Sequence, residues 1–503
     1  MVKSSRAFPR VSSLFGSLLF VMAGAAPAAT PATLPSITLL PSTPGKLETR
    51  SMPFITSPHD LEGEGYVEEE YLIAGKANIY GYANDAEKKT DVEALKTDTD
   101  YVTRILVRRP ADKNKFNGSV LVEVLNATAG WDGDPIWYGS HETLARRGFA
   151  WVGVSTKPVT VNFLRDLWGK DPRPVRNASR YATLSMPAFG QVWDMLTQVG
   201  QLLKSEKPTE NPLKGFDVRR LIMVGYSQSA GYEITYANSF HGRSLMADGR
   251  PIYDGYFIAA GGSRAKHVTA DTPATESLPA NDPRNLIRVN VPVVRYQTQT
   301  EVAGFGANQV RQKDEEYPLL RTYEVAGTSH VDAYRDSQSS LALRRDLGLE
   351  DSFCPKPALP YNPVNSGLYE AATLLMLDAW IRDGRKPPAS RFMSLANNEG
   401  TIKLARDALG NVIGGVRPPE LEAPLGSYME SNAGEGFCTL FGGFKPFKTD
   451  TLKGLYPSAN IYVRSFTTAA RTLATEGFLD KFDAERLILS ARRNGTAASA
   501  GIN

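Results

Sequence analysis

Ser227 occupies a segment that could present a serine hydroxyl as a nucleophile. The segment Gly225-Tyr226-Ser227-Gln228-Ser229 follows the apolar run 221–224 and precedes residues 230–240, which a helix could continue. A strand, a tight turn and a helix around Gly-x-Ser-x-small are the signature of a nucleophile elbow, which exposes the serine to a base. This motif usually ends in glycine, whereas this chain has Ser229, which is still small. We therefore expect Ser227 to be a nucleophile.

A second match to the same pattern is centred on Ser263 and has a different context. A chain of this length should contain Gly-x-Ser-x-small about once by chance. Ser263 also follows a candidate strand, but residues 264–273 lack the apolar period of a helix. We therefore interpret Ser263 as a loop residue.

A nucleophilic serine needs a base, and His330 is the best-placed histidine for that role. It follows the candidate strand 319–325 through a short loop, so it should lie at the C-terminal end of that strand. Two other histidines lie downstream of Ser227. His241 ends the helix that follows the nucleophile, and His267 lies in a polar loop with no strand before it.

The base in turn needs an orienting acid, for which Glu301 is the first candidate. It is the first carboxylate after the candidate strand 291–296, and the order serine, acid, histidine is the one that α/β-hydrolases use. An ordinary surface glutamate is the alternative interpretation. Asp314 and Asp332 are the other candidate acids, but Asp314 lies in a charged run and Asp332 follows His330 by only two residues.

The oxyanion formed by nucleophilic attack needs backbone donors. We expect one from Gln228, directly after the nucleophile, and one from Asn126 or Ala127, in the small-residue loop after the strand 120–125. Trp131, Trp137 and Tyr138 follow that loop and could line an apolar acyl or alcohol pocket. The same aromatic residues could instead pack against a cap.

Alternating strands and helices predict an α/β fold that would place these residues at one sheet edge. The candidate strands are 119–125, 149–154, 221–224, 253–260, 291–296 and 319–325, and the candidate helices between them are 138–147, 189–203 and 230–240. We expect a mostly parallel central sheet with helices on both faces. Residues 66–75 and 101–110 predict antiparallel strands at one edge, joined by a solvated, charged connection, 85–100.

The chain divides into five predicted parts. Residues 1–28 have the pattern of an export signal, 29–50 of a linker, and 51–334 of an α/β-hydrolase core. Residues 335–465 are too long for a connector and predict a cap or lid-like insertion, or else a structural apron, with one amphipathic helix over 367–382. Residues 466–503 are expected to complete the core as two helices broken at Gly477.

The predicted export signal bears on compartment and partners. Lys3, Arg6 and Arg10 precede an apolar stretch, 14–22, that is too short to remain as a membrane span after cleavage. Its loss would take the formal charge from +3 to zero, which gives no support to a nucleic-acid partner. We expect a secreted or periplasmic protein, with no oligomeric state implied.

The two cysteines of the chain, Cys354 and Cys438, predict one disulfide in such a compartment, with two unpaired buried thiols as the alternative. Neither they nor the five scattered histidines have metal-ligand spacing. We therefore expect no metal and no organic cofactor.

Several segments resemble those of the large bacterial "alpha/beta hydrolase domain" family. They are residues 65–71, 116–126, 225–230, 324–332, 407–411, 414–417 and 438–442, which together extend over nearly the whole mature chain. The resemblance implies an α/β-hydrolase fold and a serine esterase-like activity. Relatives often carry two acidic residues after the late strand, where this chain has Gln299 and Glu301.

These observations predict a secreted carboxylic-ester hydrolase that uses Ser227, His330 and Glu301 through an acyl-enzyme. Its substrate would be a small-molecule or polymeric ester. Three alternatives stay open: a polyester or polymer depolymerase, an amidase or peptidase with the same triad, and a non-catalytic binding protein on a hydrolase fold.

Overall fold

The computed structural model describes residues 34–43, 51–168, 180–206, 211–269, 277–348, 352–398 and 401–500. The predicted export signal, residues 1–28, lies outside these ranges, as do residues 29–33 and 44–50 of the predicted linker. No helix in the described ranges is long and apolar enough to cross a membrane.

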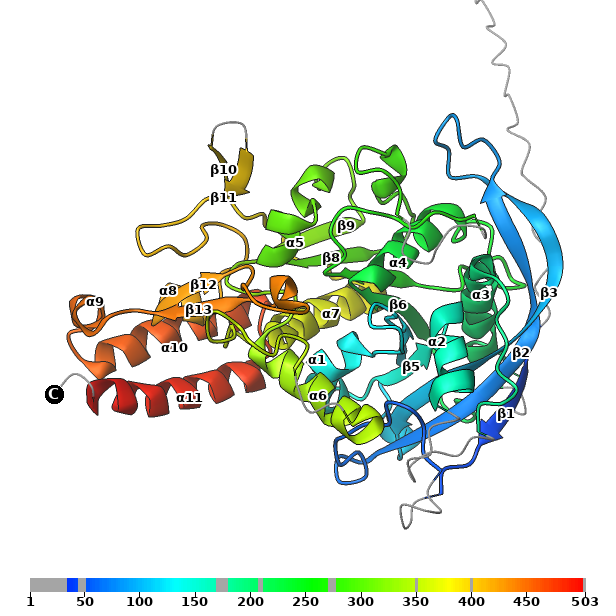
Figure 1. Cartoon of the computed structure of the whole chain (residues 1–503), viewed down its shortest axis with the longest axis horizontal. Coiled ribbons are helices and arrows are strands. Elements are labelled where there is room, and N and C mark those ends of the chain that lie inside the picture. The colour runs from blue at the N-terminus through cyan, green and yellow to red at the C-terminus, as the bar shows by residue number, and fades with distance from the viewer. Residues whose placement is uncertain are drawn as a thin grey trace, which may run out of the picture.

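A nine-stranded sheet is the centre of the fold, in the order β1-β2-β3-β5-β4-β6-β7-β8-β9 (Figure 1). Its strands are β1 (Ser36–Leu40), β2 (Tyr66–Tyr82), β3 (Val92–Pro110), β4 (Ser119–Val124), β5 (Ala150–Val154), β6 (Arg220–Tyr226), β7 (Gly255–Ala259), β8 (Val293–Thr298) and β9 (Leu320–Val325). From β5 to β9 neighbouring strands are parallel, and β1, β2 and β3 add an antiparallel edge. The predicted mostly parallel sheet is confirmed.

Helices cover both faces of this sheet. On one face α1 (Pro135–Arg146) and α7 (Ser366–Asp383) pack together, and on the other lie α3 (Val192–Leu203) and α4 (Gln228–Ser239) (Figure 1). Every residue of β4 and β6 is buried, as expected for parallel strands covered on both sides. Two short helices, α2 (Pro158–Asn162) and α5 (Gln299–Gly304), follow the strands β5 and β8.

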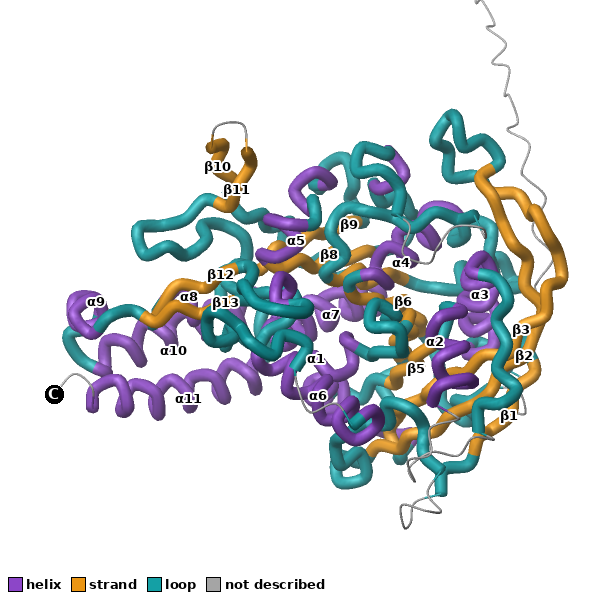
Figure 2. Tube along the Cα trace, viewed as in Figure 1, coloured by secondary structure: helices purple, strands orange, loops and turns teal. Residues whose placement is uncertain are grey.

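The antiparallel edge differs from its prediction in two places. Residues 92–100 were predicted as a connection, but they belong to β3 and pair with β2 in a long hairpin that wraps the sheet edge (Figure 2). Residues 93–97 are all exposed, so this stretch has no alternation of apolar and polar residues that would predict a strand. In the predicted linker, β1 pairs antiparallel with β2.

The chain beyond β9 forms helices and two small hairpins. They are α6 (Ala333–Leu347), β10 (Leu395–Asn398), β11 (Thr401–Leu404), α8 (Pro419–Glu422), β12 (Gly426–Met429), β13 (Gly443–Pro446), α9 (Thr449–Leu455), α10 (Ala459–Glu476) and α11 (Lys481–Ala500). The last two helices break at Gly477 as predicted, but α10 begins earlier. Figure 2 shows α9, α10 and α11 extending away from the sheet beside β12 and β13. The boundaries of the cap and core stay predictions.

The helices α10 and α11 pack on the ends of α8 and α9 in a small apolar cluster, made by Ala423, Tyr456, Tyr462, Phe466 and Ala491. Closer to the sheet, Leu473, Phe478 and Ile488 join the main core. Cys354 and Cys438 form the predicted disulfide. It is buried beside Phe441 and links two segments of the predicted cap.

Candidate active site

Ser227 lies at the turn between β6 and α4, as the elbow motif predicts. Its backbone has φ 60° and ψ −120°, a conformation that costs energy for any residue with a Cβ. The Ser227 N–H donates to the carbonyl of Ala259 (2.9 Å), which ties the turn to the neighbouring strand β7. A Cβ on Gly225 would lie 3.0 Å from the backbone of Ser229, so glycine is needed for strand and helix to approach this closely.

His330 and Glu301 meet at the C-terminal ends of β9 and β8. The His330 Nδ1 atom lies 2.6 Å from Glu301 Oε1, so a proton on Nδ1 would be donated to the carboxylate. Glu301 is fully buried, and burial alone would raise the pKa of its carboxyl. Hydrogen bonds from His330 and Thr298 outweigh burial and hold that pKa below its ordinary value.

A helix cap holds the acid in place. The second oxygen of Glu301 accepts from the Thr298 backbone N–H (2.7 Å) and from the Thr298 hydroxyl (2.6 Å). This is a capping box at the start of α5, in which threonine and glutamate are three residues apart. One carboxylate therefore fixes the helix start with one oxygen and contacts His330 with the other. The Thr-x-x-Glu spacing is a signal for this helix start that is present in the sequence.

The two other candidate acids form hydrogen bonds to groups other than His330. Asp332 caps α6 by accepting from the Arg335 N–H (2.9 Å) and also accepts from the Ser366 N–H (3.0 Å). Asp314 accepts from the Ser390 N–H (2.9 Å). His241, the other histidine considered near the elbow helix, contacts the Tyr256 hydroxyl (2.8 Å).

The loop that carries His330 is anchored on both sides. The His330 N–H donates to the Thr300 hydroxyl (3.0 Å), and the Tyr226 hydroxyl donates to the His330 carbonyl (2.7 Å). Gln299 accepts from the Gly327 N–H (2.7 Å) and donates to the carbonyl of Tyr428 (3.3 Å), so this amide links the histidine loop to the predicted cap. Sequence reasoning missed these positioning roles.

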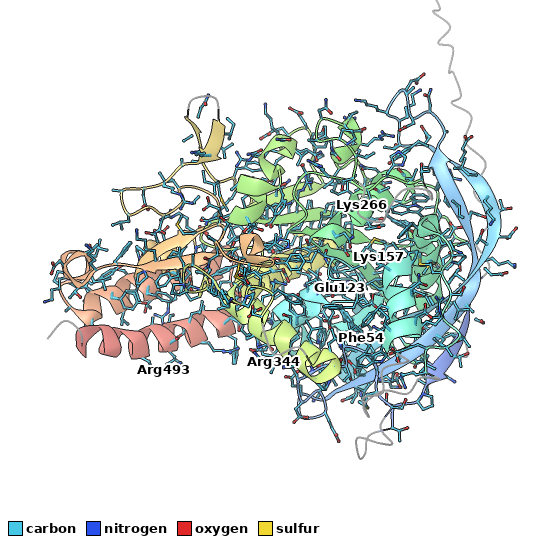
Figure 3. The ribbon with its side chains drawn as sticks, in the orientation of Figure 1. Phe54, Glu123, Lys157, Lys266, Arg344 and Arg493 are labelled. Atoms are coloured by element: carbon cyan, nitrogen blue, oxygen red, sulfur yellow. A yellow bond between two sulfur atoms is a disulfide. The ribbon has the colours of Figure 1, made fainter. Side chains whose placement is uncertain are left out.

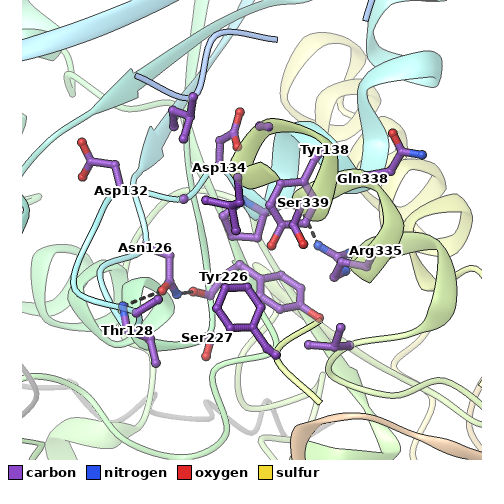
Figure 4. Close-up of a pocket in the computed structure, with 18 of the residues that line it drawn as sticks. Asn126, Thr128, Asp132, Asp134, Tyr138, Tyr226, Ser227, Arg335, Gln338 and Ser339 are labelled. Carbon is purple, nitrogen blue, oxygen red and sulfur yellow. Dashed lines mark hydrogen bonds between the residues drawn. The ribbon is translucent and has the colours of Figure 1, made fainter. Parts of the chain in front are cut away.

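Of the three predicted oxyanion donors, Gln228 and Ala127 remain candidates and Asn126 does not. The N–H of Gln228 is at the first position of α4, where a helix leaves amides without intrahelical acceptors. The Ala127 N–H donates to the Gln228 side-chain carbonyl over a long 3.3 Å. Asn126 donates to Gly133 through its backbone (2.8 Å) and to the Tyr226 carbonyl through its side chain (3.0 Å), so it orders the loop (Figure 4). Its backbone amide is therefore not a free donor for an oxyanion.

An open cavity of about 1070 Å³ lies beside Ser227 and His330 (Figure 4). The three predicted pocket residues, Trp131, Trp137 and Tyr138, all line it. Residues beyond β9 line another part of it, namely Val331, Gln338, Ser339, Ala342, Leu343, Phe353, Phe437, Leu440 and Phe441. Trp131 also packs 6.2 Å from the Phe353 ring, so it both lines the cavity and contacts the predicted cap.

The charged residues of this first cavity are paired within the protein. Asp132 bonds Arg104 (3.0 Å), and Asp134 bonds Arg108. Arg335 bonds Glu370 (2.8 Å). Because these charges are compensated, the first cavity is an aromatic and apolar space with little net charge.

Lys157 lies behind the elbow and is fully buried. Its ammonium donates to the Leu125 carbonyl and to the Ser229 hydroxyl (3.1 Å), and Ser229 also donates to the Leu125 carbonyl (3.2 Å). The Tyr232 ring lies 4.9 Å away. Burial lowers the pKa of Lys157 to about 7. Ser229 therefore completes a buried polar cluster that glycine, the usual residue here, could not complete.

No cluster of three or more histidine, cysteine, aspartate or glutamate side chains in the described ranges is arranged to hold a metal ion. The site consists of a strained serine, a histidine bonded to a buried carboxylate, and an adjoining apolar cavity. On a mostly parallel sheet with this strand order, these features define an α/β-hydrolase.

The comparison with protein families agrees with that class. The chain belongs to the family described as alpha/beta hydrolase domain, which matches residues 40–489. No curated protein matches the chain.

Solved structures are similar at low identity. A lidless serine hydrolase of Xanthomonas campestris is 10% identical, with 48% of this chain and 89% of that chain covered and a TM-score of 0.27. Esterase 2 of Thermogutta terrifontis is 9% identical, with 44% and 77% covered and a TM-score of 0.28. A carboxylesterase of Lactobacillus plantarum is 10% identical, with 50% and 91% covered and a TM-score of 0.30.

Proposed function

We propose that this protein is an exported carboxylic-ester hydrolase that acts through Ser227, His330 and Glu301. The observation that carries the proposal is the 2.6 Å contact between His330 and Glu301, beside a cavity that His330 shares with the strained Ser227. A hydroxyl is a poor nucleophile at neutral pH, and a neighbouring imidazole oriented by a carboxylate supplies the base it lacks.

In the first half of the reaction, the Ser227 oxygen bonds to the ester carbonyl carbon while its proton passes to His330. The carbonyl electron pair moves onto the oxygen, where the charge is stabilised by the N–H of Gln228 and by that of Ala127, which exchanges its long bond to the Gln228 side chain for one to the oxyanion. His330 then returns the proton to the departing alcohol, which leaves an ester between Ser227 and the acyl group. Glu301 stabilises the positive imidazolium throughout.

In the second half, water attacks the acyl-enzyme and gives its proton to His330. The bond between the acyl carbon and the Ser227 oxygen breaks, and the serine takes the proton back. The products are one carboxylic acid and one alcohol, so the reaction consumes one water and needs no further reactant.

Export is part of the proposal and has two supports. The basic and apolar pattern of residues 1–28 is typical of a secretory signal, and a buried disulfide is typical of an oxidising compartment. Fractionation of cells that express the full chain checks this point. Recovery of uncleaved protein from the cytosol would contradict it.

Matched 4-nitrophenyl esters and 4-nitroanilides of the same acyl groups test the activity. We expect the wild-type protein to hydrolyse the esters, and Ser227→Ala to lose at least about 10⁴-fold in kcat. A larger kcat/KM for the anilides would make the protein an amidase. Full ester hydrolysis by Ser227→Ala would contradict the proposal.

A further inference from the structure

A second cavity adjoins the proposed nucleophile and differs in chemistry from the first. It has a volume of about 1140 Å³ and is also open, and Ser227 and His330 line both cavities. Its other walls come from α4 and the loops after β7 and α5. They contribute the polar or cationic residues Arg264, Lys266, Ser277 and Gln309, together with the apolar residues Ala260, Ala280 and Phe305.

The cationic side of this cavity is formed by Arg264 and Lys266. None of the described residues that line the cavity is an aspartate or a glutamate. Arg264 is exposed and forms no ion pair with any residue in the described part of the chain. Lys266 is only 7% exposed, and its ammonium donates to the Ser277 hydroxyl (3.0 Å).

The loop that carries the two cations is fixed against the elbow helix. The Lys266 N–H donates to the carbonyl of Gly231 (3.1 Å), and the Thr235 hydroxyl donates to the carbonyl of Lys266 (2.6 Å). The Ala265 N–H donates to the Asn285 side chain (2.9 Å). The backbone positions of the two cationic residues relative to the elbow helix are therefore set by the fold, and a fixed scaffold is what a binding subsite requires.

The local electrostatics favour a bound anion. Burial and the nearby charge of Arg264 lower the pKa of Lys266 to about 8. The charge of Lys266 in turn contributes to the lowered pKa of Lys157, and Figure 3 shows these two lysines in the same part of the core. An anion placed in the cavity beside Arg264 and Lys266 would stabilise the charged form of Lys266.

We infer that the second cavity binds a carboxylate or another anionic group of the substrate, on the side of the scissile ester opposite an apolar group in the first cavity. The inference rests on the proposed function, because it requires that Ser227 attack an ester whose two sides extend into the two cavities. A substrate of this class is an ester with an apolar part and an anionic part. The subsite could receive the anion on either the acyl or the alcohol side, so the test has two arms.

The first arm compares mono(4-nitrophenyl) succinate with 4-nitrophenyl methyl succinate, which differ in the charge of the acyl group. The second compares 4-acetoxybenzoate with its methyl ester, which differ in the charge of the leaving group. The rate without enzyme is subtracted from each rate, because the carboxylate of the mono ester speeds its own spontaneous hydrolysis. We expect the anionic ester to have the larger kcat/KM in one arm, and rising salt to reduce its advantage because exposed charges are screened.

Arg264→Gln should lower the ratio of kcat/KM for the anionic ester to kcat/KM for its neutral partner by about tenfold or more. A hydrogen bond to a charged partner typically contributes a factor of this size. Arg288→Gln is the matched control, at another exposed arginine that lines neither cavity. It should leave the ratio unchanged.

Equal or lower rates for the anionic ester in both arms would overturn the inference, as would an unchanged ratio in Arg264→Gln. In those cases hydrolysis of the neutral esters would still support the proposed function. Failure to hydrolyse any of the four esters would contradict the proposed function, and the inference with it.

Discussion

The ammonium of Lys157 lies 3.1 Å from the hydroxyl of Ser229, directly behind the nucleophile elbow. Both groups bind the carbonyl of Leu125, the last residue before the loop of Asn126 and Ala127. The cluster therefore joins the elbow helix to the loop that carries a candidate oxyanion donor. A lysine in this place has a cost, because a fully buried ammonium is far less well solvated than one in water.

We predict that the buried lysine makes stability depend on pH. Burial lowers the pKa of Lys157 to about 7 in the folded state, whereas an unfolded lysine holds its proton up to about pH 10.4. The folded state thus binds fewer protons between these values. Its stability relative to Lys157→Met should rise with pH in that window, by at most about 1.4 kcal/mol per pH unit.

Urea unfolding of both proteins at pH 6.5 and pH 9 measures this difference. Lys313→Met, a change at an exposed lysine, serves as the control. A difference in unfolding free energy between wild type and Lys157→Met that stays constant over this range would show that Lys157 does not change its protonation there.

Glu301→Gln tests the role of the buried acid. Glutamine keeps the size and one acceptor of the side chain but loses the charge that faces His330. We expect kcat to fall by about 10²-fold to 10⁴-fold with a smaller change in KM, because the imidazolium forms only during the reaction.

Asp314→Asn is the matched control for this change, since Asp314 bonds Ser390 and is the alternative acid suggested by the sequence. Both variants are compared by ester kinetics and by thermal unfolding. A large loss of kcat in Asp314→Asn with a normal rate in Glu301→Gln would reverse the assignment of the acid.

Removal of the disulfide should destabilise the protein and disturb the first cavity. Cys354 and Cys438 are separated by 84 residues, and a link of this span typically contributes roughly 2–4 kcal/mol to the free energy of unfolding. Phe353 and Phe437, their neighbours in the chain, line the cavity. The double variant Cys354→Ser/Cys438→Ser should unfold at lower urea and show a higher KM for apolar esters.

Wild-type protein with reductant should behave like this double variant. Identical urea midpoints for the variant and the oxidised wild type would show that the link contributes nothing to stability. An unchanged KM would show that the disulfide does not position the residues that line the cavity.

Local sequence patterns were sufficient for the parallel strands of the sheet and for the contact between Glu301 and His330. The elbow motif, the apolar runs and the order of the residues after successive strands each depend on short segments. The burial of Lys157 had no such signal, because its partners Leu125 and Ser229 are brought to it only by the folded sheet.

The same reason explains the other differences. Arg264 and Lys266 lie in a loop without periodicity, and only the fold places that loop beside Ser227. Most of the strand residues 92–100 are exposed and several are charged, so their pairing with β2 left no apolar alternation in the sequence. Asn126 was predicted as an oxyanion donor from its place after a strand, whereas its hydrogen bonds order the loop.

The identity of the nucleophile is the central claim, and covalent labelling tests it most directly. A fluorophosphonate reacts with an activated serine, so mass spectrometry of the digested protein locates the nucleophile. We predict a single label on the peptide that contains Ser227, and none after Ser227→Ala. A label on Ser263, or no label on folded wild-type protein, would contradict the account.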